Sequence, residues 1–287
     1  MIATTALVFC LIKEFLGPKH VSKILKVTEN FIAVDKTYDL KINSNDQNEL
    51  TLQTFLKHKF PKLPRGNLHH EFYFVHRLDY STSGVMCIPL NKITCKAVAL
   101  AFQERYTEKY YIAIVRGWLS IDCLEINSPI GEDTRDTEIH KMCCDKNFYI
   151  NPKKARTFMI VLEKGIFKDY PATKILIRPI TGRRHQIRVH CNYLGHTIVG
   201  DYTYSNRKDV EPYRTYLHSL RLVIPSNIDH FEVQTEDPFL HDEQWYSISV
   251  VNELNCDIFE KFKVISSAHK ACVVCKCKIF RLQVGFL

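Results

Sequence analysis

The sequence lacks a long apolar run of the kind that crosses a membrane. Its opening stretch, MIATTALVFCLI, is apolar but shorter than the ~20 residues of a membrane-spanning helix, and it has no arginine and no positively charged n-region. We therefore expect no membrane partner. Residues 1–20 are predicted to be an N-terminal extension, with a cleaved signal or import peptide as the alternative.

Four motifs of common enzyme classes are also missing. The chain contains no GxGxxG, no GxxxxGK(S/T), no GxSxG and no HExxH. These patterns supply a phosphate cradle, an activated nucleophile or a pair of zinc ligands. Their absence argues against dinucleotide-dependent, P-loop, α/β-hydrolase and zincin functions. No internal repeat, heptad run or low-complexity tract is visible.

What the sequence does contain is enough apolar material for a core and an excess of positive charge. Its 287 residues are 46% apolar, and 39 lysines and arginines against 31 acids give a net charge of +8. This surplus predicts a polyanion such as nucleic acid as the partner, and an ordinary mildly basic protein is the alternative. The length fits one large domain or two small ones.

The cysteines do not form a disulfide pattern. There are eleven, an odd number without framework spacing, so we expect a reducing compartment and mostly buried thiols. We favour a cytoplasmic protein over a nuclear or mitochondrial one. The group Cys272, Cys275 and Cys277 could bind zinc, but a closed structural site needs four ligands, and His269 would make a cramped fourth. We do not expect a metal there.

Hydrophobic periodicity predicts strands mixed irregularly with helices. Strands are predicted at 24–27, 31–36, 72–76, 85–90, 110–115, 157–163, 173–180, 197–199 and 221–224. Helices are predicted at 52–60, 93–105 and 183–194, the last with Gly195 just past its end. Residues 122–150 are predicted to be a polar surface loop with a little irregular strand. The pattern favours the α+β class, with a main domain at 21–240 and a C-terminal extension at 241–287.

Two segments concentrate the residues that carry chemistry. The first, FYFVHRLDYSTSG at 72–84, delivers the basic pair His76 and Arg77 and then the carboxylate of Asp79 onto a turn rich in Ser, Thr and Gly. The second, 180–204, has three arginines and two histidines within eight positions and could give that carboxylate a cationic partner. We expect the functional site where the two segments meet.

The basic groups of the second segment allow two interpretations. These groups are Arg183, Arg184, His185, Arg188 and His190. They could bind phosphates, or they could line a solvated helix face. A metal site built from His185, His190 and His196 is disfavoured, because positions five apart on a helix lie about 140° apart and do not share a face.

Three ordered motifs resemble the RluA-type family of pseudouridine synthases. HRLDxxTSG matches residues 76–84, KxYxAxVxG matches 109–117, and TGRxHQ(L/I)RxH followed by LGHxIxGDxxY matches 181–190 and 194–204. The resemblance covers about residues 21–238. It implies an α+β pseudouridine synthase fold, with a mixed, mostly antiparallel sheet and flanking helices around a central basic cleft.

One stretch departs from the family pattern. After Lys36 the family commonly has Pro-x-Gly, whereas this chain has Thr37, Tyr38 and Asp39. Substrate contacts made by that stretch are therefore in question. We expect no S4 RNA-binding module, which some members of the family carry at the N-terminus, because too few residues precede residue 21.

The resemblance also implies roles for individual residues. It makes Asp79 the catalytic carboxylate, Arg188 its cationic partner, Tyr111 the aromatic that stacks on the target uracil, and Ile187 the opposite wall. A carboxylate suits the reaction because it can attack carbon, or stabilise positive charge at C1′, and later leave. The residues alone allow plainer interpretations, with Asp79 as a turn former, Tyr111 as a core aromatic and Ile187 as helix packing.

Substrate binding is expected from the neighbouring basic residues. An enzyme that acts on a base inside a stem must flip that base out, and by the resemblance Arg77, beside His76, would fill the gap. Arg183 and Arg184 would hold phosphates, with Lys154 as a further candidate.

We therefore expect a pseudouridine synthase, an isomerase that converts uridine to pseudouridine in RNA, with tRNA and rRNA as candidate substrates. The reaction breaks the N1–C1′ bond and joins C5 to C1′ without a redox step, so no cofactor or metal is expected. We expect a monomer. The alternatives are a catalytically inactive RNA-binding protein on the same fold and a zinc-dependent nucleic-acid protein that uses the C-terminal cysteines.

Overall fold

The computed structural model describes residues 21–46, 48–135 and 141–272, with residues 265–272 described by backbone alone. The chain divides into two compact units, residues 1–251 and 252–287, and the second contains α5 (Cys256–Cys272). The predicted domain border at residue 240 stays a prediction. Within the described ranges, no helix is long and apolar enough to cross a membrane.

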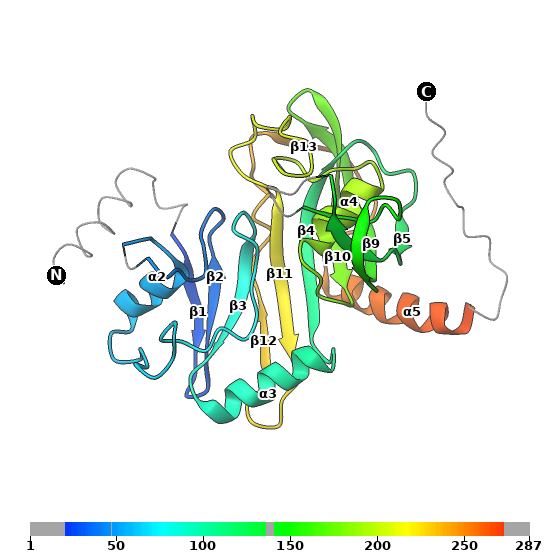
Figure 1. The fold of residues 1–287 in the computed structure, drawn as a ribbon. Helices are drawn as coiled ribbons and strands as arrows, with labels where there is room; N and C mark the ends of the chain where they lie inside the picture. Colours follow the sequence, from blue (N-terminus) through cyan, green and yellow to red (C-terminus); the bar gives the residue numbers. More distant parts are fainter. Residues whose placement is uncertain (1–20, 47, 136–140, 273–287) are drawn as a thin grey trace. The chain divides into compact units, whose positions relative to one another are not determined.

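Ten strands of the described residues form one sheet in the first unit (Figure 1). The order is β1 (Lys23–Val27), β2 (Phe31–Lys36), β3 (Ser83–Pro89), β11 (Leu217–Ile224), β4 (Glu108–Arg116), β10 (Tyr170–Pro179), β9 (Thr157–Phe167) and β13 (Trp245–Val250), with β12 (Phe231–Gln234) on β11 and β5 (Cys123–Ile126) on β9. The pairings are antiparallel except that of β3 with β11, which is parallel. The predicted α+β class and the mixed, mostly antiparallel sheet are confirmed.

Helices flank the sheet because its strands alternate apolar side chains between two faces. Phe31 of β2 packs with α3 (Lys92–Gln103), whereas its neighbour Ile32 packs with α2 (Leu52–Lys59). The helix α4 (Gln186–Tyr193) packs on the part of the sheet made by β4, β9 and β10. The helices α2 and α3 therefore cover the two faces of the sheet at β2, and α4 covers the part made by β4, β9 and β10.

Capping residues explain where two of these helices begin. Thr51 accepts the Thr54 N–H at 3.1 Å at the start of α2, and Asn91 accepts the Thr94 N–H at 2.9 Å at the start of α3. Gly195, which follows α4, has φ of 79°, the left-handed conformation expected after a helix.

The predicted strand at 72–76 is wrong. These residues join no sheet, and both sides of the neighbouring strand β3 are occupied, by β2 and by β11. Phe72 and Leu78 instead bury their side chains in the cluster around α2. Asp79 therefore follows an irregular, anchored segment and precedes the strand β3.

The polar region 122–150 is more regular than a surface loop. It contributes β5 to the large sheet and supplies most of a second sheet, whose order is β7 (Met142–Cys143), β6 (Ile130–Asp133) and β8 (Tyr149–Lys153). Strands of two to five residues are too short for alternation to be recognised in the sequence.

Three other predictions are corrected. The helix predicted at 183–194 begins at Gln186, because His185 has the left-handed φ of 52°. The strand predicted at 197–199 is an isolated bridge between Val115 and Ile198. Beyond Pro238, where the sequence shows no clear periodicity, the structure has the strand β13 and the helix α5.

The two halves of the sheet are joined through a short parallel contact between β3 and β11. It pairs Ser83 with His218 and Gly84 with Ser219. Gly84 has φ of 116°, and a Cβ added to it would lie 2.3 Å from the carbonyl oxygen of Ser219. Glycine alone permits this backbone conformation and this close approach. The last residue of the HRLDxxTSG motif is therefore required by the sheet.

We predict that Gly84→Ala destabilises the protein by more than about 2 kcal/mol, because the new Cβ meets backbone atoms that cannot turn away. Gly66→Ala is the matched control, since an added Cβ meets nothing within 4 Å there. Urea unfolding followed by circular dichroism measures both. Equal unfolding midpoints for the two variants would contradict the prediction.

Candidate active site

A pocket of about 390 Å³ lies where the loop before β3, the strand β4 and the start of α4 come together. It is lined by His76, Arg77, Leu78, Asp79, Thr82, Phe102, Lys109, Tyr111, Pro179, Thr181, Gly182, Arg183, Arg184, His185, Gln186, Ile187, Arg188 and Leu217. All eight site residues named from the sequence are among them. Asp79 is the one acidic side chain in this set. The two chemistry-bearing segments therefore meet, as the sequence predicts.

Asp79 is held by its backbone and leaves its side chain partly exposed. Its carbonyl oxygen accepts the Thr82 N–H at 3.1 Å, which closes the turn. The next carbonyl, of Tyr80, accepts Nζ of Lys36 at 3.2 Å and the Leu40 N–H at 3.2 Å. The Asp79 side chain is 23% exposed. The carboxylate is thus fixed in place and still open to a ligand.

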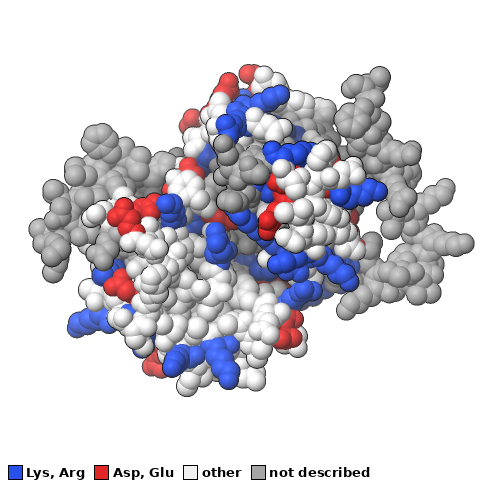
Figure 2. Space-filling view, in the orientation of Figure 1, with Lys and Arg blue, Asp and Glu red and all other residues white. Residues whose placement is uncertain are grey.

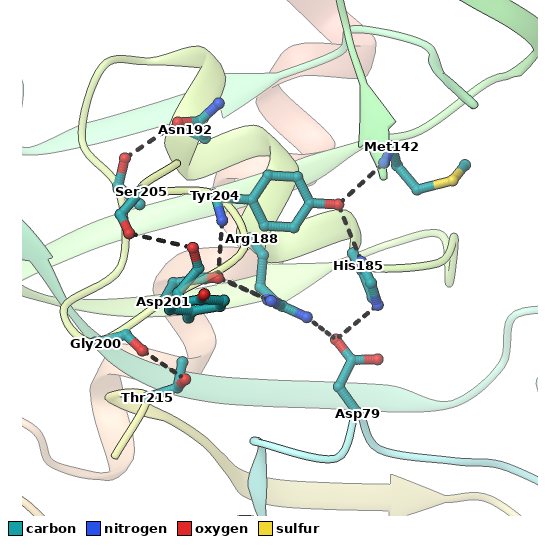
Figure 3. Close-up of polar contacts among 12 residues, drawn as sticks. Asp79, Met142, His185, Arg188, Asn192, Gly200, Asp201, Tyr204, Ser205 and Thr215 are labelled. Atoms are coloured by element: carbon teal, nitrogen blue, oxygen red, sulfur yellow. Dashed lines mark hydrogen bonds and ion pairs between the residues drawn. The ribbon is translucent and has the colours of Figure 1, made fainter. Parts of the chain in front are cut away.

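Arg188 forms the strongest contacts of the site with a second carboxylate (Figure 3). Its Nε and Nη2 donate to the two oxygens of Asp201 at 2.7 and 2.8 Å, while Nη1 lies 3.4 Å from Oδ2 of Asp79. Burial alone would lower the pKa of Arg188, but the hydrogen bonds to Asp201 and the charges of both acids raise it above its ordinary value. Arg188 is therefore a permanent cation beside Asp79.

Tyr111 and Ile187 are apolar surfaces of the same pocket. Tyr111, on β4, packs against the residues around both α4 and α2, and Ile187, on α4, is 7% exposed. Burial raises the pKa of Tyr111 to about 12, and the charge of Asp79 adds to this effect. The Tyr111 hydroxyl is therefore protonated at neutral pH.

His76 and Arg77 both line the pocket, but His76 is bonded within the protein whereas Arg77 is exposed. The Nε2 atom of His76 accepts the Cys87 N–H at 2.9 Å, and its ring stacks on Phe102 with centroids 4.8 Å apart. Burial lowers the pKa of His76 to about 4, so this ring is neutral and structurally engaged. Arg77 is exposed.

Basic side chains lie next to the start of α4. Arg184 is exposed, and Nε of Arg183 donates to the carbonyl oxygen of Lys154 at 2.9 Å. Lys154 is itself exposed. In Figure 2, lysine and arginine side chains gather across the middle of the face in view. These groups are free to meet an anionic ligand.

Sequence reasoning assigned no role to Asp201 and Tyr204, although both belong to the matched LGHxIxGDxxY motif. Asp201 is fully buried and neutralises Arg188. Tyr204 places its ring 5.0 Å from the guanidinium of Arg188 and bonds His185 through its hydroxyl at 3.0 Å. The signal was the motif itself, but the partners of these residues can be identified only in the folded chain.

The stretch that departs from the family pattern lies outside this pocket. Thr37 and Tyr38 line a different cavity of about 590 Å³, and the Tyr38 ring lies 4.4 Å from the guanidinium of Arg214. Asp39 has φ of 50° at the place where the family commonly has glycine, and Asp tolerates this conformation better than most residues. The departure therefore keeps the backbone path without entering the pocket around Asp79.

The three histidines considered for a metal are occupied by protein atoms. His190 contacts Thr157 Oγ1 at 2.8 Å and the Ser128 carbonyl at 3.1 Å, and Nδ1 of His196 contacts the Arg116 carbonyl at 2.8 Å. Among the described residues, no group of His, Cys, Asp or Glu is arranged to hold a metal ion. The side chains of Cys272, Cys275 and Cys277 lie outside the described residues.

Comparisons with known proteins agree on one family. The family model for RNA pseudouridylate synthase matches residues 30–193. RNA pseudouridylate synthase domain-containing protein 1 of Danio rerio is 40% identical over 235 residues, which are 80% of each chain, and that of Mus musculus is 42% identical over 221 residues, 76% of this chain and 72% of the relative. The dual-specificity RNA pseudouridine synthase RluA of Haemophilus ducreyi is 36% identical over 171 residues, 57% of this chain and 73% of the relative.

A solved structure gives the same result. The structure of human RNA pseudouridylate synthase domain containing 1 superposes with a TM-score of 0.76 and 34% identity, and the match covers 86% of this chain and 96% of that one. Human RNA pseudouridylate synthase domain containing 4, at 20% identity and a TM-score of 0.60, is similar in fold.

We predict that Asp201→Ala costs about 3–5 kcal/mol of stability, because it leaves the Arg188 guanidinium buried with its main counter-ion removed. The matched control is Asp209→Ala, which removes a bidentate partner of Arg116. The side chains of that pair are 27% and 14% exposed, against 8% and 0% for Arg188 and Asp201, so the loss should be smaller. Chemical unfolding of the two variants tests this, and equal losses would contradict it.

Proposed function

The chain belongs to the RNA pseudouridylate synthase family, a family of isomerases, and we propose that it converts uridine to pseudouridine in RNA with Asp79 as its catalytic carboxylate. The RluA-type resemblance found in the sequence is confirmed by this membership. The proposed activity is carried by one observation: a partly exposed carboxylate lies 3.4 Å from a guanidinium whose charge is already balanced by a second acid.

The reaction proposed here rearranges bonds without adding or removing electrons overall. The N1–C1′ bond breaks, the uracil turns, C5 bonds to C1′, and the proton lost from C5 is matched by the proton gained at N1. A carboxylate can attack carbon or stabilise the positive charge that develops at C1′, and it can leave in a later step. The chemistry therefore asks for an ionised, accessible acid and for no redox cofactor.

The geometry around Asp79 supports this task. Arg188 places a positive charge 3.4 Å from Oδ2 of Asp79. Both Arg188 and His185 approach the same oxygen, Oδ2, at 3.4 and 4.0 Å. The other oxygen, Oδ1, has no hydrogen-bond partner among the described residues. Oδ1 is thus the oxygen available to the substrate.

Tyr111 and Ile187 suit a flat base. The aromatic ring on β4 and the aliphatic side chain on α4 both line the pocket that contains Asp79. We propose that uracil stacks on Tyr111, with Ile187 as the opposite wall. Removal of the C5 proton needs a base, and Tyr111 can act as one only after its hydroxyl has lost its own proton. Its pKa of about 12 makes that phenolate a strong base.

Access to a uridine in a stem requires that the base leave the helix. Unstacking costs a few kcal/mol, which contacts to the extruded nucleotide must offset. Arg77 is exposed at the pocket and can occupy the vacated position, while Arg183 and Arg184 can hold flanking phosphates. A tRNA or rRNA substrate is consistent with this arrangement.

A catalytically inactive RNA-binding protein on the same fold is the second candidate. The exchange of Pro-x-Gly for Thr37, Tyr38 and Asp39 next to Lys36 is the feature in its favour, although Lys36 keeps its bond to the Tyr80 carbonyl. The partly exposed carboxylate argues against it. A protein that only binds RNA gains nothing from an anion facing an anionic ligand.

We predict that Asp79→Asn lowers pseudouridine formation by about a thousandfold or more, because an amide cannot replace the carboxylate in attack or charge stabilisation. Tritium release from RNA labelled at uridine C5 measures this. The exposed Asp169→Asn is the matched control, since Asp169 lies outside the pocket. Full activity of Asp79→Asn would refute the mechanism, and an inactive wild-type chain that still binds RNA would favour the second candidate.

We predict that Arg183→Ala with Arg184→Ala weakens RNA binding about tenfold and makes it less dependent on salt, because fewer counterions are released. The control is Lys59→Ala with Lys62→Ala, which removes the same charge from exposed positions outside the pocket. Binding measured at several salt concentrations separates a local contact from a general charge effect. Equal weakening by both double variants would argue against a local phosphate site.

A further inference from the structure

His185 occupies the left-handed backbone conformation, which is uncommon for residues other than glycine. It has φ of 52° and ψ of 21° at the start of α4 and forms no side-chain cap. Glycine or asparagine would adopt this left-handed conformation at lower cost. Strain of this kind persists where the surrounding structure holds a side chain in place, and it clusters at functional sites. The His185 side chain is therefore the feature to explain.

A chain of hydrogen bonds fixes the imidazole ring (Figure 3). The Met142 N–H, from β7, donates to the Tyr204 hydroxyl oxygen at 3.2 Å, and that hydroxyl lies 3.0 Å from Nδ1 of His185. The hydroxyl oxygen accepts one bond from the backbone and can donate its proton to Nδ1. That direction leaves the proton of the neutral imidazole on Nε2, the nitrogen that faces the negative charge of Asp79.

The protonated nitrogen faces the catalytic acid. Nε2 of His185 lies 4.0 Å from Oδ2 of Asp79, the same oxygen that Arg188 approaches at 3.4 Å. Arg188 is thus at hydrogen-bond distance from this oxygen, whereas His185 is too far for a hydrogen bond and acts on it only through the dipole of its N–H. Oδ1 has no hydrogen-bond partner among the described residues.

The charges around His185 come from three elements. Asp79 lies on the loop before β3, Arg184 and Arg188 lie next to and within α4, and Asp201 and Tyr204 lie on the loop after α4. Burial lowers the pKa of His185 to about 4, and the two arginines add to this effect, although both acids oppose it. The ring is thus neutral across the physiological range.

We infer that His185 is a positioning residue that, as the Nε2–H tautomer, presents its N–H dipole to Oδ2 of Asp79 and so favours the orientation in which Oδ1 is left to the substrate. This role rests on the proposed function of Asp79. It also gives the second sheet a part in the site, because Met142 of β7 donates its N–H to the Tyr204 hydroxyl that contacts the ring. Val189 of α4 and Tyr204 belong to one buried cluster, on which Met142 packs.

Kinetic variants separate this role from a purely structural one. His185→Gly removes the ring at a backbone conformation that glycine accepts, so it should fold, and we expect kcat to fall about tenfold with less than about a twofold change in KM. His185→Gln, which keeps an N–H donor near the position of Nε2, should restore most of the activity. Tyr204→Phe should lower kcat in the same direction as His185→Gly.

His196→Ala is the matched control, since that ring bonds the Arg116 carbonyl outside the pocket and its loss should leave kcat unchanged. The inference is overturned if His185→Gly keeps the kcat of the wild type, if His185→Gln is as slow as His185→Gly, or if the loss is confined to KM. Thermal unfolding of each variant identifies any loss of activity that is due to misfolding.

A measurement independent of activity distinguishes failure of this inference from failure of the proposed function. Nitrogen NMR of the full chain labelled at histidine reports which ring nitrogen of His185 carries the proton. We expect Nε2–H in the wild type, a mixture of tautomers in Tyr204→Phe, and a shift of the Nε2 signal in Asp79→Asn. An Nδ1–H tautomer, or an Nε2 signal that ignores Asp79→Asn, would overturn the inference even if the wild type makes pseudouridine.

Discussion

The site depends on the buried guanidinium of Arg188, whose charge is balanced by one acid, Asp201, while it also lies next to a second acid, Asp79. Nε and Nη2 of Arg188 donate to fully buried Asp201, and Nη1 lies at a longer distance from Asp79. A carboxylate locked in a short bidentate pair would have both oxygens engaged and would be a poor nucleophile. Because Asp201 is the main counter-ion, its pairing with Arg188 offsets the desolvation penalty of burying the guanidinium. Asp79 therefore has a positive neighbour at Oδ2, while Oδ1 has no hydrogen-bond partner among the described residues.

The topology of the sheet explains how residues distant in sequence reach this point. Asp79 precedes β3, Tyr111 lies on β4, and β11 lies between these two strands. The β3–β11 contact pairs Gly84 with Ser219, and Ser219 in turn pairs with Tyr111 of β4. The distance between the acid and the aromatic ring is therefore set by one intervening strand. A side chain at Gly84 would push β3 away from β11 and with it the loop that bears Asp79.

Much of this could be predicted from the sequence where local signals suffice. The hairpin of β1 and β2 follows from two β-prone runs on either side of a short polar turn, and the helices α2 and α3 follow from helical spacing and the caps at Thr51 and Asn91. The segment 72–76 shows the limit, because an apolar run need not pair in a sheet when its side chains are buried elsewhere, as Phe72 is in the cluster around α2. The hydroxyl that contacts the His185 ring is bonded by Met142, which lies 43 positions from His185 and on another sheet. No local pattern contains that information.

The stretch from Lys36 to Asp39 shows how a departure from a family pattern can be located by geometry. Adjacent residues on a strand face opposite sides of a sheet, and here Leu217 and Thr82 line the pocket around Asp79 while His218 and Ser83 line the cavity that contains Thr37 and Tyr38. The altered residues thus lie on the side of the sheet away from the pocket. Lys36 still reaches the carbonyl of Tyr80, and so the anchoring of the Asp79 loop is kept. The exchange consequently changes the side chains that line the cavity on the opposite face. The arrangement of Asp79, Arg188 and Tyr111 does not require proline or glycine at those positions.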